Sequence, residues 1–185
     1  MKKGIFFITA YFLFCLIVCN AQNDEIKHYT SFYGGIGSGF DYGGIGFKAE
    51  WLPVKYISIF AGAGANFDNV GYNGGFSFKI LPAKKSTPFV MAMYGYNAVL
   101  KTKAPASGIT TFVKTYYGFS AGAGYDIRVG KKFNKISLAI IIPFRNNEFT
   151  DKYNEFKDQG YLFKPEKSDV LGSIGFNIGI PATSK

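Results

Sequence analysis

Apolar residues alternate with small or polar residues along most of the chain that follows residue 21. The longest such stretch runs from Phe112 to Val129, where odd-numbered positions are mostly apolar and even-numbered positions are mostly polar, charged or glycine. Because successive side chains of a strand point to opposite faces, this pattern predicts one long strand with an apolar side and a polar side. At ~3.3 Å per residue, such a strand crosses the hydrocarbon core of a membrane even when it is tilted.

The same alternation recurs and predicts about eight strands in all. It is clear in Gly44–Trp51, Ile57–Phe67, Tyr72–Ile80, Phe112–Val129 and Val170–Ile180, and weaker in Tyr29–Phe40, Phe89–Leu100 and Lys135–Arg145. After residue 21, no apolar run is long enough for a membrane-spanning helix.

The glycines decide which kind of β-structure these strands form. They occupy alternate positions on one face, as in Gly35-Ile36-Gly37-Ser38-Gly39, Gly62-Ala63-Gly64 and Gly122-Ala123-Gly124. Charged residues fall on the same face, which inverts the pattern of a soluble sandwich. In a narrow barrel, inward glycines make room for neighbouring Tyr, Lys and Arg side chains. We therefore expect a closed antiparallel up-and-down transmembrane β-barrel of about eight strands.

The connections between the strands differ in length at the two ends of this barrel. Short lysine-bearing turns follow even-numbered strands at 52–56, 81–88 and 130–134, and the long loops Lys101–Thr110 and Asn146–Asp169 follow odd-numbered ones. This asymmetry is typical of short periplasmic turns and longer external loops. Two external connections are expected to be tight, Asp41–Gly43 and Asp68–Gly71. Aromatic girdles are predicted from Trp51, Tyr56 and Phe78 at one end and Phe40, Phe67, Tyr72 and Phe144 at the other.

The N-terminus predicts export. Lys2 and Lys3 precede an apolar run, and Cys19-Asn20-Ala21 places small residues before Gln22 as in a cleavage site. We expect a signal peptide at 1–21 and a single barrel domain at 22–185 in the bacterial outer membrane. An uncleaved anchor and a lipid on Cys19 are the alternatives. Both cysteines, Cys15 and Cys19, belong to the leader, so the mature chain has no thiol.

The basic charge does not indicate nucleic acid. The formal charge of +9 becomes +7 when Lys2 and Lys3 leave with the leader. The remaining lysines are scattered over turns and loops, with no basic stripe. The expected partners are outer-membrane lipid and a surface or envelope protein; no nucleic acid and no small-molecule substrate is expected.

From about Tyr29 to Ile180 the chain resembles the small outer-membrane β-barrel proteins of the OmpA/OmpX-like and OmpW-like group. The resemblance lies in the number and alternation of the strands and in no diagnostic motif. It implies an eight-stranded barrel in the outer membrane. Such barrels usually end on an aromatic residue, whereas here Ile180 is followed by Pro-Ala-Thr-Ser-Lys.

No catalytic, cofactor-binding or metal-binding constellation is predicted. The only histidine, His28, precedes the first strand, and no acid lies in register with it. Metal-ligating residues do not cluster. The run Gly35-x-Gly37-x-Gly39 has the period of a strand and lacks the helix of a nucleotide loop.

Two groups of residues remain as candidate sites. The first is a lumen charge cluster of Glu50, Lys79, Asp126 and Arg128, expected to form an ion-paired plug near one end of the barrel. The second is the Asn146–Asp169 loop with its aromatics Phe149, Tyr153, Phe156, Tyr161 and Phe163. A short helix would gather the first three on one face, at i, i+4 and i+7. These aromatics either recognise a partner or fold onto the barrel rim as a cap or an extended hairpin.

We therefore expect a non-enzymatic outer-membrane barrel with a structural or surface-recognition role through its external loops. The first alternative is an exported soluble barrel that binds a small apolar ligand, as lipocalin-like proteins do; it would have an apolar lumen and a charged outside. The second alternative is a lipid-modifying barrel enzyme, which a single histidine disfavours. A solute channel is disfavoured because eight strands leave no open aqueous path.

Overall fold

The structure is a computed structural model, and it describes residues 31–66, 69–82, 84–103, 110–130, 133–163 and 169–180. The predicted signal peptide at 1–21, His28, Phe67 and the side chain of Phe163 lie outside the described part.

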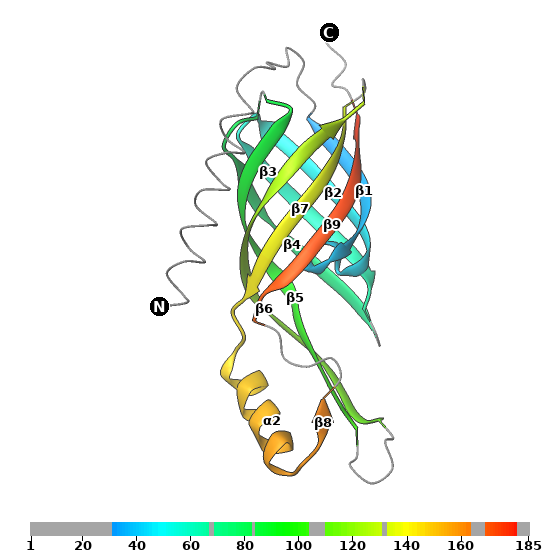
Figure 1. Ribbon diagram of the computed structural model, residues 1–185, viewed down its shortest axis with the longest axis vertical. Helices are drawn as coiled ribbons and strands as arrows, with labels where there is room; N and C mark the ends of the chain where they lie inside the picture. Colours follow the sequence, from blue (N-terminus) through cyan, green and yellow to red (C-terminus); the bar gives the residue numbers. More distant parts are fainter. Residues whose placement is uncertain are drawn as a thin grey trace, which may run out of the picture.

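Eight antiparallel strands close into a barrel (Figure 1). They are β1 (Phe32–Gly39), β2 (Gly44–Val54), β3 (Ile57–Ala65), β4 (Val70–Lys79), β5 (Ser86–Lys103), β6 (Thr110–Val129), β7 (Asn134–Pro143) and β9 (Leu171–Ile180). Each strand pairs with the next of the eight along the chain, and the pairing of β9 with β1 closes the sheet. The prediction of an all-β, closed antiparallel barrel of eight strands is confirmed.

The observed strands follow the predicted ones closely. Gly44–Trp51 lies within β2, and Phe112–Val129 lies within β6. The weakly alternating stretch Phe89–Leu100 belongs to β5, where the register with β6 shifts between Tyr96 and Ala98. Such a bulge adds a residue to one strand and interrupts the strict alternation of faces. This explains why the pattern is weaker there.

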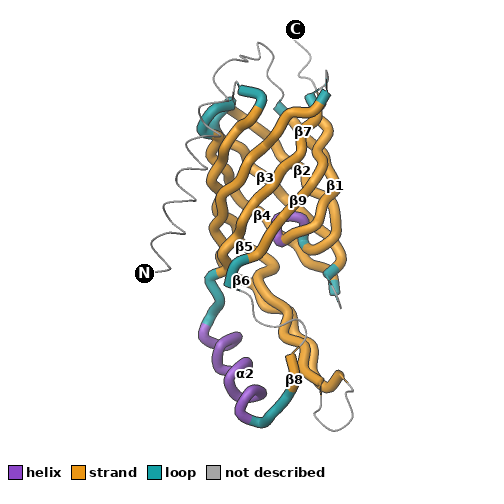
Figure 2. Tube along the Cα trace, viewed as in Figure 1, coloured by secondary structure: helices purple, strands orange, loops and turns teal. Residues whose placement is uncertain are grey.

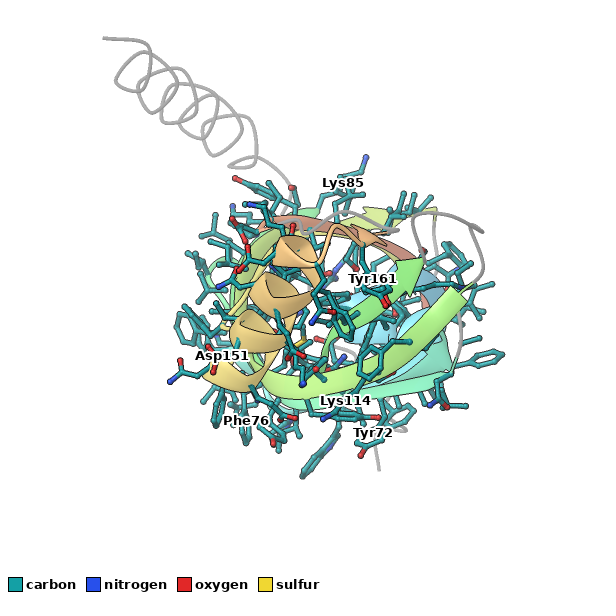
Figure 3. The ribbon with its side chains drawn as sticks, turned by 90° about the horizontal axis from the view of Figure 1, so that it is seen from below. Tyr72, Phe76, Lys85, Lys114, Asp151 and Tyr161 are labelled. Carbon is teal, nitrogen blue, oxygen red and sulfur yellow. The ribbon has the colours of Figure 1, made fainter. Side chains whose placement is uncertain are left out.

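The wall of the barrel is apolar outside and polar inside. On β6, Phe119 is 66 % exposed whereas the next residue, Ser120, is 2 % exposed. Tyr72 and Phe76 of β4 project away from the barrel in the same way (Figure 3). Where the strands form the closed wall, every described Asp, Glu, Lys and Arg is on the inward-facing side, namely Lys48, Glu50, Lys79, Asp126, Arg128 and Lys135. The arrangement is the reverse of a soluble sandwich.

The β5–β6 hairpin continues beyond the wall (Figure 2). There, residues Ala98–Lys103 pair with Thr110–Tyr116, with neither β4 nor β7 beside them. The segment after β7 forms helix α2 (Asn147–Asp158) and the short strand β8 (Leu162–Phe163), which pairs with β5. We call this part of the hairpin, together with α2 and β8, the extension. No helix in the described part of the chain is long and apolar enough to span a membrane.

The turns β2–β3, β4–β5 and β6–β7 lie at the end of the barrel opposite the extension, here called the short-turn end (Figure 1). The predicted asymmetry between short turns and long connections is thus present. The long connection Asn146–Asp169 contains α2 and β8 and is therefore largely folded where it is described.

The β1–β2 connection, here called the inward turn, folds into the barrel. It forms one 3-10 turn, η1 (Phe40–Tyr42), and Gly43 after it has a φ of 72°, which glycine adopts without strain. Asp41 and Tyr42 are buried, and η1 contacts β1 to β5 and β9. The expectation that Asp41–Gly43 is an external turn is wrong. Phe40 is likewise not part of an outer girdle, because its ring packs inside against Tyr96, with 4.6 Å between the centroids.

A row of inward-facing glycines makes room for η1. The row runs through paired positions of β9, β1, β2, β3 and β4, namely Gly175, Gly37, Gly46, Gly64 and Gly71. A side-chain carbon at Gly46 or Gly64 would lie 2.6 or 2.5 Å from the carbonyl oxygen of Tyr42. These distances are too short for real carbon atoms, so the glycines are what allows the chain to enter the lumen.

Candidate functional site

Four charged side chains meet inside the barrel toward its short-turn end: Glu50 of β2, Lys79 of β4, Asp126 of β6 and Lys135 of β7. The Nζ atom of Lys79 lies 2.7 Å from Oε1 of Glu50 and 2.7 Å from Oδ2 of Asp126. The Nζ atom of Lys135 lies 2.5 Å from Oε2 of Glu50 and 2.8 Å from Oδ2 of Asp126. Each ammonium group bridges both carboxylates. We call these four residues the lumen quartet.

The lumen quartet is electrically neutral, and this is what makes its burial tolerable. An uncompensated ion in a protein interior costs several kcal/mol even after relaxation. Here two cations offset two carboxylates, and all four side chains are almost fully buried. The ammonium groups also lie over aromatic rings, at 4.4 Å from the Phe89 centroid for Lys79 and 4.1 Å from the Tyr33 centroid for Lys135. Such contacts help to stabilise a buried ammonium group.

Arg128 is not part of the quartet. Of the predicted cluster, Glu50, Lys79 and Asp126 come together, and Lys135 takes the place given to Arg128. The Nη2 atom of Arg128 instead donates to the carbonyl oxygen of Pro82 in the β4–β5 turn, at 3.0 Å. Lys135 was missed because it stands at the start of a weakly alternating strand, directly after a lysine-bearing turn. The sequence pattern at that position does not distinguish a lysine that faces the lumen from one that faces water.

A second polar cluster surrounds η1 in the other half of the lumen. The Nζ atom of Lys48 lies 2.6 Å from Oδ2 of Asp41, and the hydroxyl of Ser173 donates to the same carboxylate. The Lys48 ammonium also lies 4.3 Å from the centroid of the Tyr42 ring. The inward turn thus brings its own carboxylate to a lysine that otherwise faces the lumen unpaired.

Hydrogen bonds connect this second cluster to the quartet. The hydroxyl of Tyr42 donates to Oδ1 of Asn177 at 3.2 Å, and Nδ2 of Asn177 lies 3.1 Å from that hydroxyl. The same amide donates to Oγ of Ser137 at 2.9 Å, and Ser137 donates to Asp126 at 2.6 Å. The lumen therefore contains one continuous polar network from η1 to the quartet.

The arrangement of the lumen residues suits a plug that closes the interior of the barrel. The quartet and the Lys48–Asp41 pair are each neutral, and Tyr42, Ser137 and Asn177 are hydrogen-bonded within the network. In the residues that the structure describes, no three His, Cys, Asp or Glu side chains gather as metal ligands do. Ser137 and Asp126 form a pair without the histidine that would complete a nucleophilic triad among the described residues.

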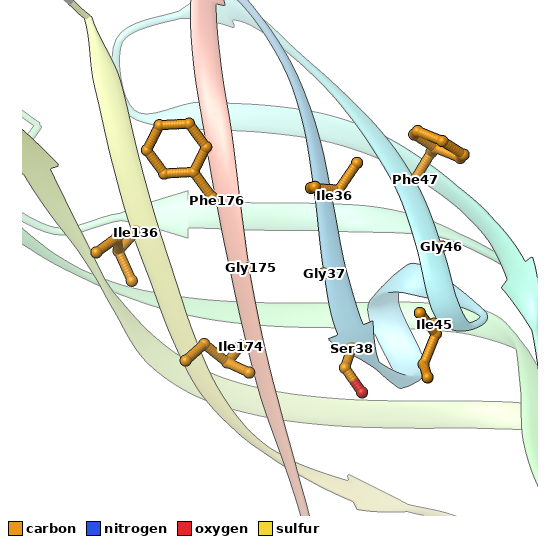
Figure 4. A pocket seen from close by; sticks show the side chains of 10 residues that line it. All are labelled: Ile36, Gly37, Ser38, Ile45, Gly46, Phe47, Ile136, Ile174, Gly175 and Phe176. Carbon is orange, nitrogen blue, oxygen red and sulfur yellow. The ribbon is translucent and has the colours of Figure 1, made fainter.

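A large hollow lies on the outer surface of the wall (Figure 4). Its volume is about 680 Å³, and it is lined by Ile36, Gly37, Ser38, Ile45, Gly46, Phe47, Ile136, Ile174, Gly175 and Phe176. The exposed side chains of β1, β2 and β9 that line it are Ile36, Ile45, Phe47, Ile174 and Phe176. A lipocalin-like barrel would have its apolar cavity inside the lumen instead.

The extension has an aromatic core of its own. Phe149, Tyr153 and Phe156 lie on the same face of α2, as their spacing predicts. Phe149 is 3 % exposed, and its ring meets the Tyr116 ring edge-on with 5.3 Å between the centroids. The ring of Phe156 lies 5.1 Å from that of Phe112. These contacts hold α2 against the hairpin.

The aromatics predicted as a recognition surface mostly face the interior of the extension. Tyr161 packs edge-on against Phe156 with 5.3 Å between the centroids, and Phe149 packs against Tyr153 at 6.1 Å. These aromatics pack on the protein itself, as the cap alternative supposed, but against the projecting part of the β5–β6 hairpin and not on the barrel rim. What α2 exposes is its polar side, formed by Asn147, Glu148, Asp151, Asn154, Glu155, Lys157 and Asp158.

Ion pairs and capping fix α2 at its edges. The Asn146 side chain accepts a hydrogen bond from the backbone N–H of Phe149 at 3.0 Å, which caps the helix. A hydrogen bond to Glu148 raises the pKa of Lys114 on the hairpin, because it favours the protonated amine. Burial lowers the pKa of Arg145, although Asp169 at 3.1 Å opposes this shift.

Comparisons with known proteins identify no family for this chain. It matches no protein-family model and no curated protein sequence. The resemblance to OmpA/OmpX-like and OmpW-like barrels stays a prediction. The lumen network and the extension are the two features from which a function can be argued.

Proposed function

We propose that this protein is a non-enzymatic bacterial outer-membrane barrel that spans the membrane with its eight strands and recognises a surface or envelope partner through the extension. The observation that carries the membrane location is the uncharged outer wall. A soluble barrel with so many exposed Ile, Val and Phe side chains would aggregate, because large apolar patches do not stay exposed to water. In lipid, the same side chains lie in their preferred environment.

Aromatic side chains at both ends of the wall support this location. At the short-turn end, Trp51 is exposed, and the rings of Tyr56 and Phe78 stack with 6.3 Å between centroids. Toward the extension, exposed Tyr94 and Phe119 pack at 5.0 Å. Tyrosine and tryptophan favour the membrane–water interface, so these two levels fit the boundaries of a hydrocarbon layer.

The polarity of the two faces argues against the lipocalin-like alternative. That alternative requires an apolar lumen and a charged outside. Here buried Lys48, Glu50 and Asp126 lie in the lumen, and the large apolar hollow is on the outside. The alternative of a lipid-modifying enzyme has no nucleophile, histidine and acid brought together in the described residues.

The extension supports a role in recognition. It projects beyond the wall, and its polar helix face is not needed to close the barrel (Figures 1 and 2). In Figure 3, Asp151 of α2 and Lys114 of the hairpin lie at the end of the molecule that faces the viewer. Segments held in place on a rigid scaffold are where binding residues commonly occur. In the proposed orientation the extension stands on the cell surface, and the short turns stand in the periplasm.

Single-cysteine labelling tests this proposal, because the expected mature chain has no cysteine of its own. Asp151→Cys on α2 and Lys85→Cys at the short-turn end would each be treated on intact cells with a membrane-impermeant maleimide. We expect Asp151→Cys to react at once and Lys85→Cys to react only after the outer membrane is permeabilised. Equal labelling of both, or recovery of the protein in the soluble fraction, would contradict the membrane topology.

Crosslinking tests recognition separately. A photo-crosslinking residue at Asn154 would be compared with one at Ile45 on the wall. We expect a defined protein adduct only from the position on α2. If deleting residues 150–164 prevents barrel assembly, the extension is part of the fold and its proposed role fails.

A further inference from the structure

A small, partly open cavity lies at the short-turn end of the lumen. It is lined by Tyr33, Leu52, Lys55, Lys79, Pro82, Thr87, Asp126, Arg128 and Lys135. Three of these, Lys79, Asp126 and Lys135, belong to the lumen quartet and are at least nine-tenths buried. The cavity therefore stands between the quartet and the turns that close this end of the barrel.

The charged groups of the lumen carry one net positive charge among the described residues. Among the described residues of the lumen, the cations are Lys48, Lys79, Arg128 and Lys135, and the carboxylates are Asp41, Glu50 and Asp126. Lys48 is paired with Asp41, and the quartet is neutral within itself. The charge left over is that of Arg128. Lys55 adds a further positive charge at the mouth of the cavity.

Arg128 also has donors to spare at this cavity. Its Nη2 atom donates to Pro82, whereas its Nη1 atom is buried and has no hydrogen-bond partner among the described residues. A buried charged donor left without an acceptor destabilises the folded protein. Among the described residues that line the cavity, Asp126 is the one carboxylate, and it already accepts from Lys79, Lys135 and Ser137.

The size of the cavity limits what it holds. The cavity volume within which the centre of a water molecule can move is about 20 Å³. A single water needs ~10–15 Å³ by the same measure, so there is room for one water or one small ion and not for a metabolite. The surplus positive charge selects the ion over the neutral molecule, since charge compensation matters most where the dielectric constant is low.

We infer that this cavity is a binding site for one small monovalent anion, of the size of chloride, held by Arg128 beside the neutral lumen quartet. The anion completes the charge balance of the lumen and satisfies the buried guanidinium nitrogen. It reaches the site from the short-turn end. This inference goes beyond the proposed function and does not depend on it, because it rests on the interior of the barrel.

Bromide provides a direct probe. Crystals of the purified full-length mature protein, grown in sodium bromide, would be measured at the bromine absorption edge. We expect one anomalous peak in the cavity within hydrogen-bond distance of Nη1 of Arg128. Density at that place without an anomalous signal would mean a water, and the inference would be wrong.

Solution measurements give an independent readout. Chloride is compared with gluconate, which is too large for the cavity, at constant ionic strength. Because a ligand that binds only the folded state stabilises it, we expect the thermal midpoint of the wild type to be higher in chloride by about 2 °C or more. Equal thermal midpoints of the wild type in the two salts would overturn the inference. This measurement needs no variant, so it remains decisive even if the variants do not fold.

Two variants localise the effect. Arg128→Gln removes the surplus charge, and we expect it to lose both the bromide peak and the chloride dependence. Lys157→Gln on α2 removes an exposed positive charge far from the cavity and is expected to keep both. If Arg128→Gln retains the full chloride dependence, the anion binds elsewhere and the assignment to this cavity fails.

Discussion

A side-chain carbon placed on Gly175 of β9 would lie 1.9 Å from the hydroxyl oxygen of Tyr42 in the inward turn. No real carbon approaches an oxygen so closely without a bond, so the inward turn and this glycine require each other. The Tyr42 ring cannot simply swing away, because it is fully buried and its hydroxyl is bonded to Asn177. The relationship explains a glycine that is unfavourable for a strand on local grounds.

Gly175→Ala is therefore expected to destabilise the barrel. Overpacking of this kind typically costs about 1–3 kcal/mol. Gly172→Ala is the matched control on the same strand, because a side-chain carbon there meets nothing within 4 Å. Denaturant unfolding in detergent micelles measures both. In a Tyr42→Ala background, Gly175→Ala should cost much less; an unchanged cost would show that the contact with Tyr42 is not the cause.

Lys135→Met is expected to be among the most damaging single changes in the lumen. It leaves Glu50 and Asp126 with one shared cation, and breaking a buried pair typically costs about 3–5 kcal/mol. Arg128→Met should cost less, because Arg128 makes no ion pair with the quartet among the described residues. The free energy of unfolding, measured in urea, compares the two variants. The prediction is contradicted if Arg128→Met proves the more harmful.

A double variant separates charge from shape in the quartet. Glu50→Gln combined with Lys135→Met leaves Lys79 and Asp126 as a neutral pair. We therefore expect the double variant to be more stable than the sum of the two single losses predicts. Additive losses would mean that the four side chains do not act as one electrostatic unit.

An arginine on the wall tests which residues touch lipid. Ala123 faces outward within the part of β6 that pairs with β7, and Val113 faces outward on the extension. In the proposed orientation, Ala123→Arg should cost about 2–4 kcal/mol near the bilayer midplane, whereas Val113→Arg should cost little. Refolding into lipid vesicles, followed by heat-modifiable migration on gels, measures the folded fraction. Equal tolerance of the two would contradict the membrane position of the wall.

Phe149→Ala is expected to release α2 without opening the barrel. A fully buried Phe typically loses about 3–5 kcal/mol on truncation, but here the loss falls on the small core of the extension. Limited proteolysis should cut α2 rapidly in this variant, while the barrel keeps its heat-modifiable migration. Asp151→Ala, on the exposed side of the same helix, serves as the control and should remain resistant. Loss of the folded barrel in Phe149→Ala would mean that the extension is needed for the fold.

The strands and their two faces were predictable from the sequence because both are properties of the local backbone. Side chains of a strand alternate by geometry, so Phe119 outside and Ser120 inside follow from their order alone. The position of Glu50, Lys79 and Asp126 in the lumen follows in the same way. Where a bulge interrupts the alternation, as between Tyr96 and Ala98, the pattern is weaker.

What the sequence could not decide is which inward residues stand at the same level. Arg128 and Lys135 pair with each other across β6 and β7, yet only Lys135 reaches both carboxylates of the quartet. The level at which a side chain meets residues from other strands depends on the stagger of the whole barrel, which is a property of the closed sheet. Alternation alone therefore favoured the wrong cation.

The location of the inward turn and the packing of the extension were also decided by the tertiary structure. Whether Asp41 and Tyr42 stand in solvent or in the lumen depends on glycines that lie on other strands and become a continuous row only when the barrel closes. The aromatics of α2 formed a helix face in the sequence, but that face had two outcomes, a partner or the protein itself. The projecting hairpin supplied Tyr116 and Phe112 beneath it, and because burying those rings together removes apolar surface from water, the helix packs inward and leaves its polar side exposed.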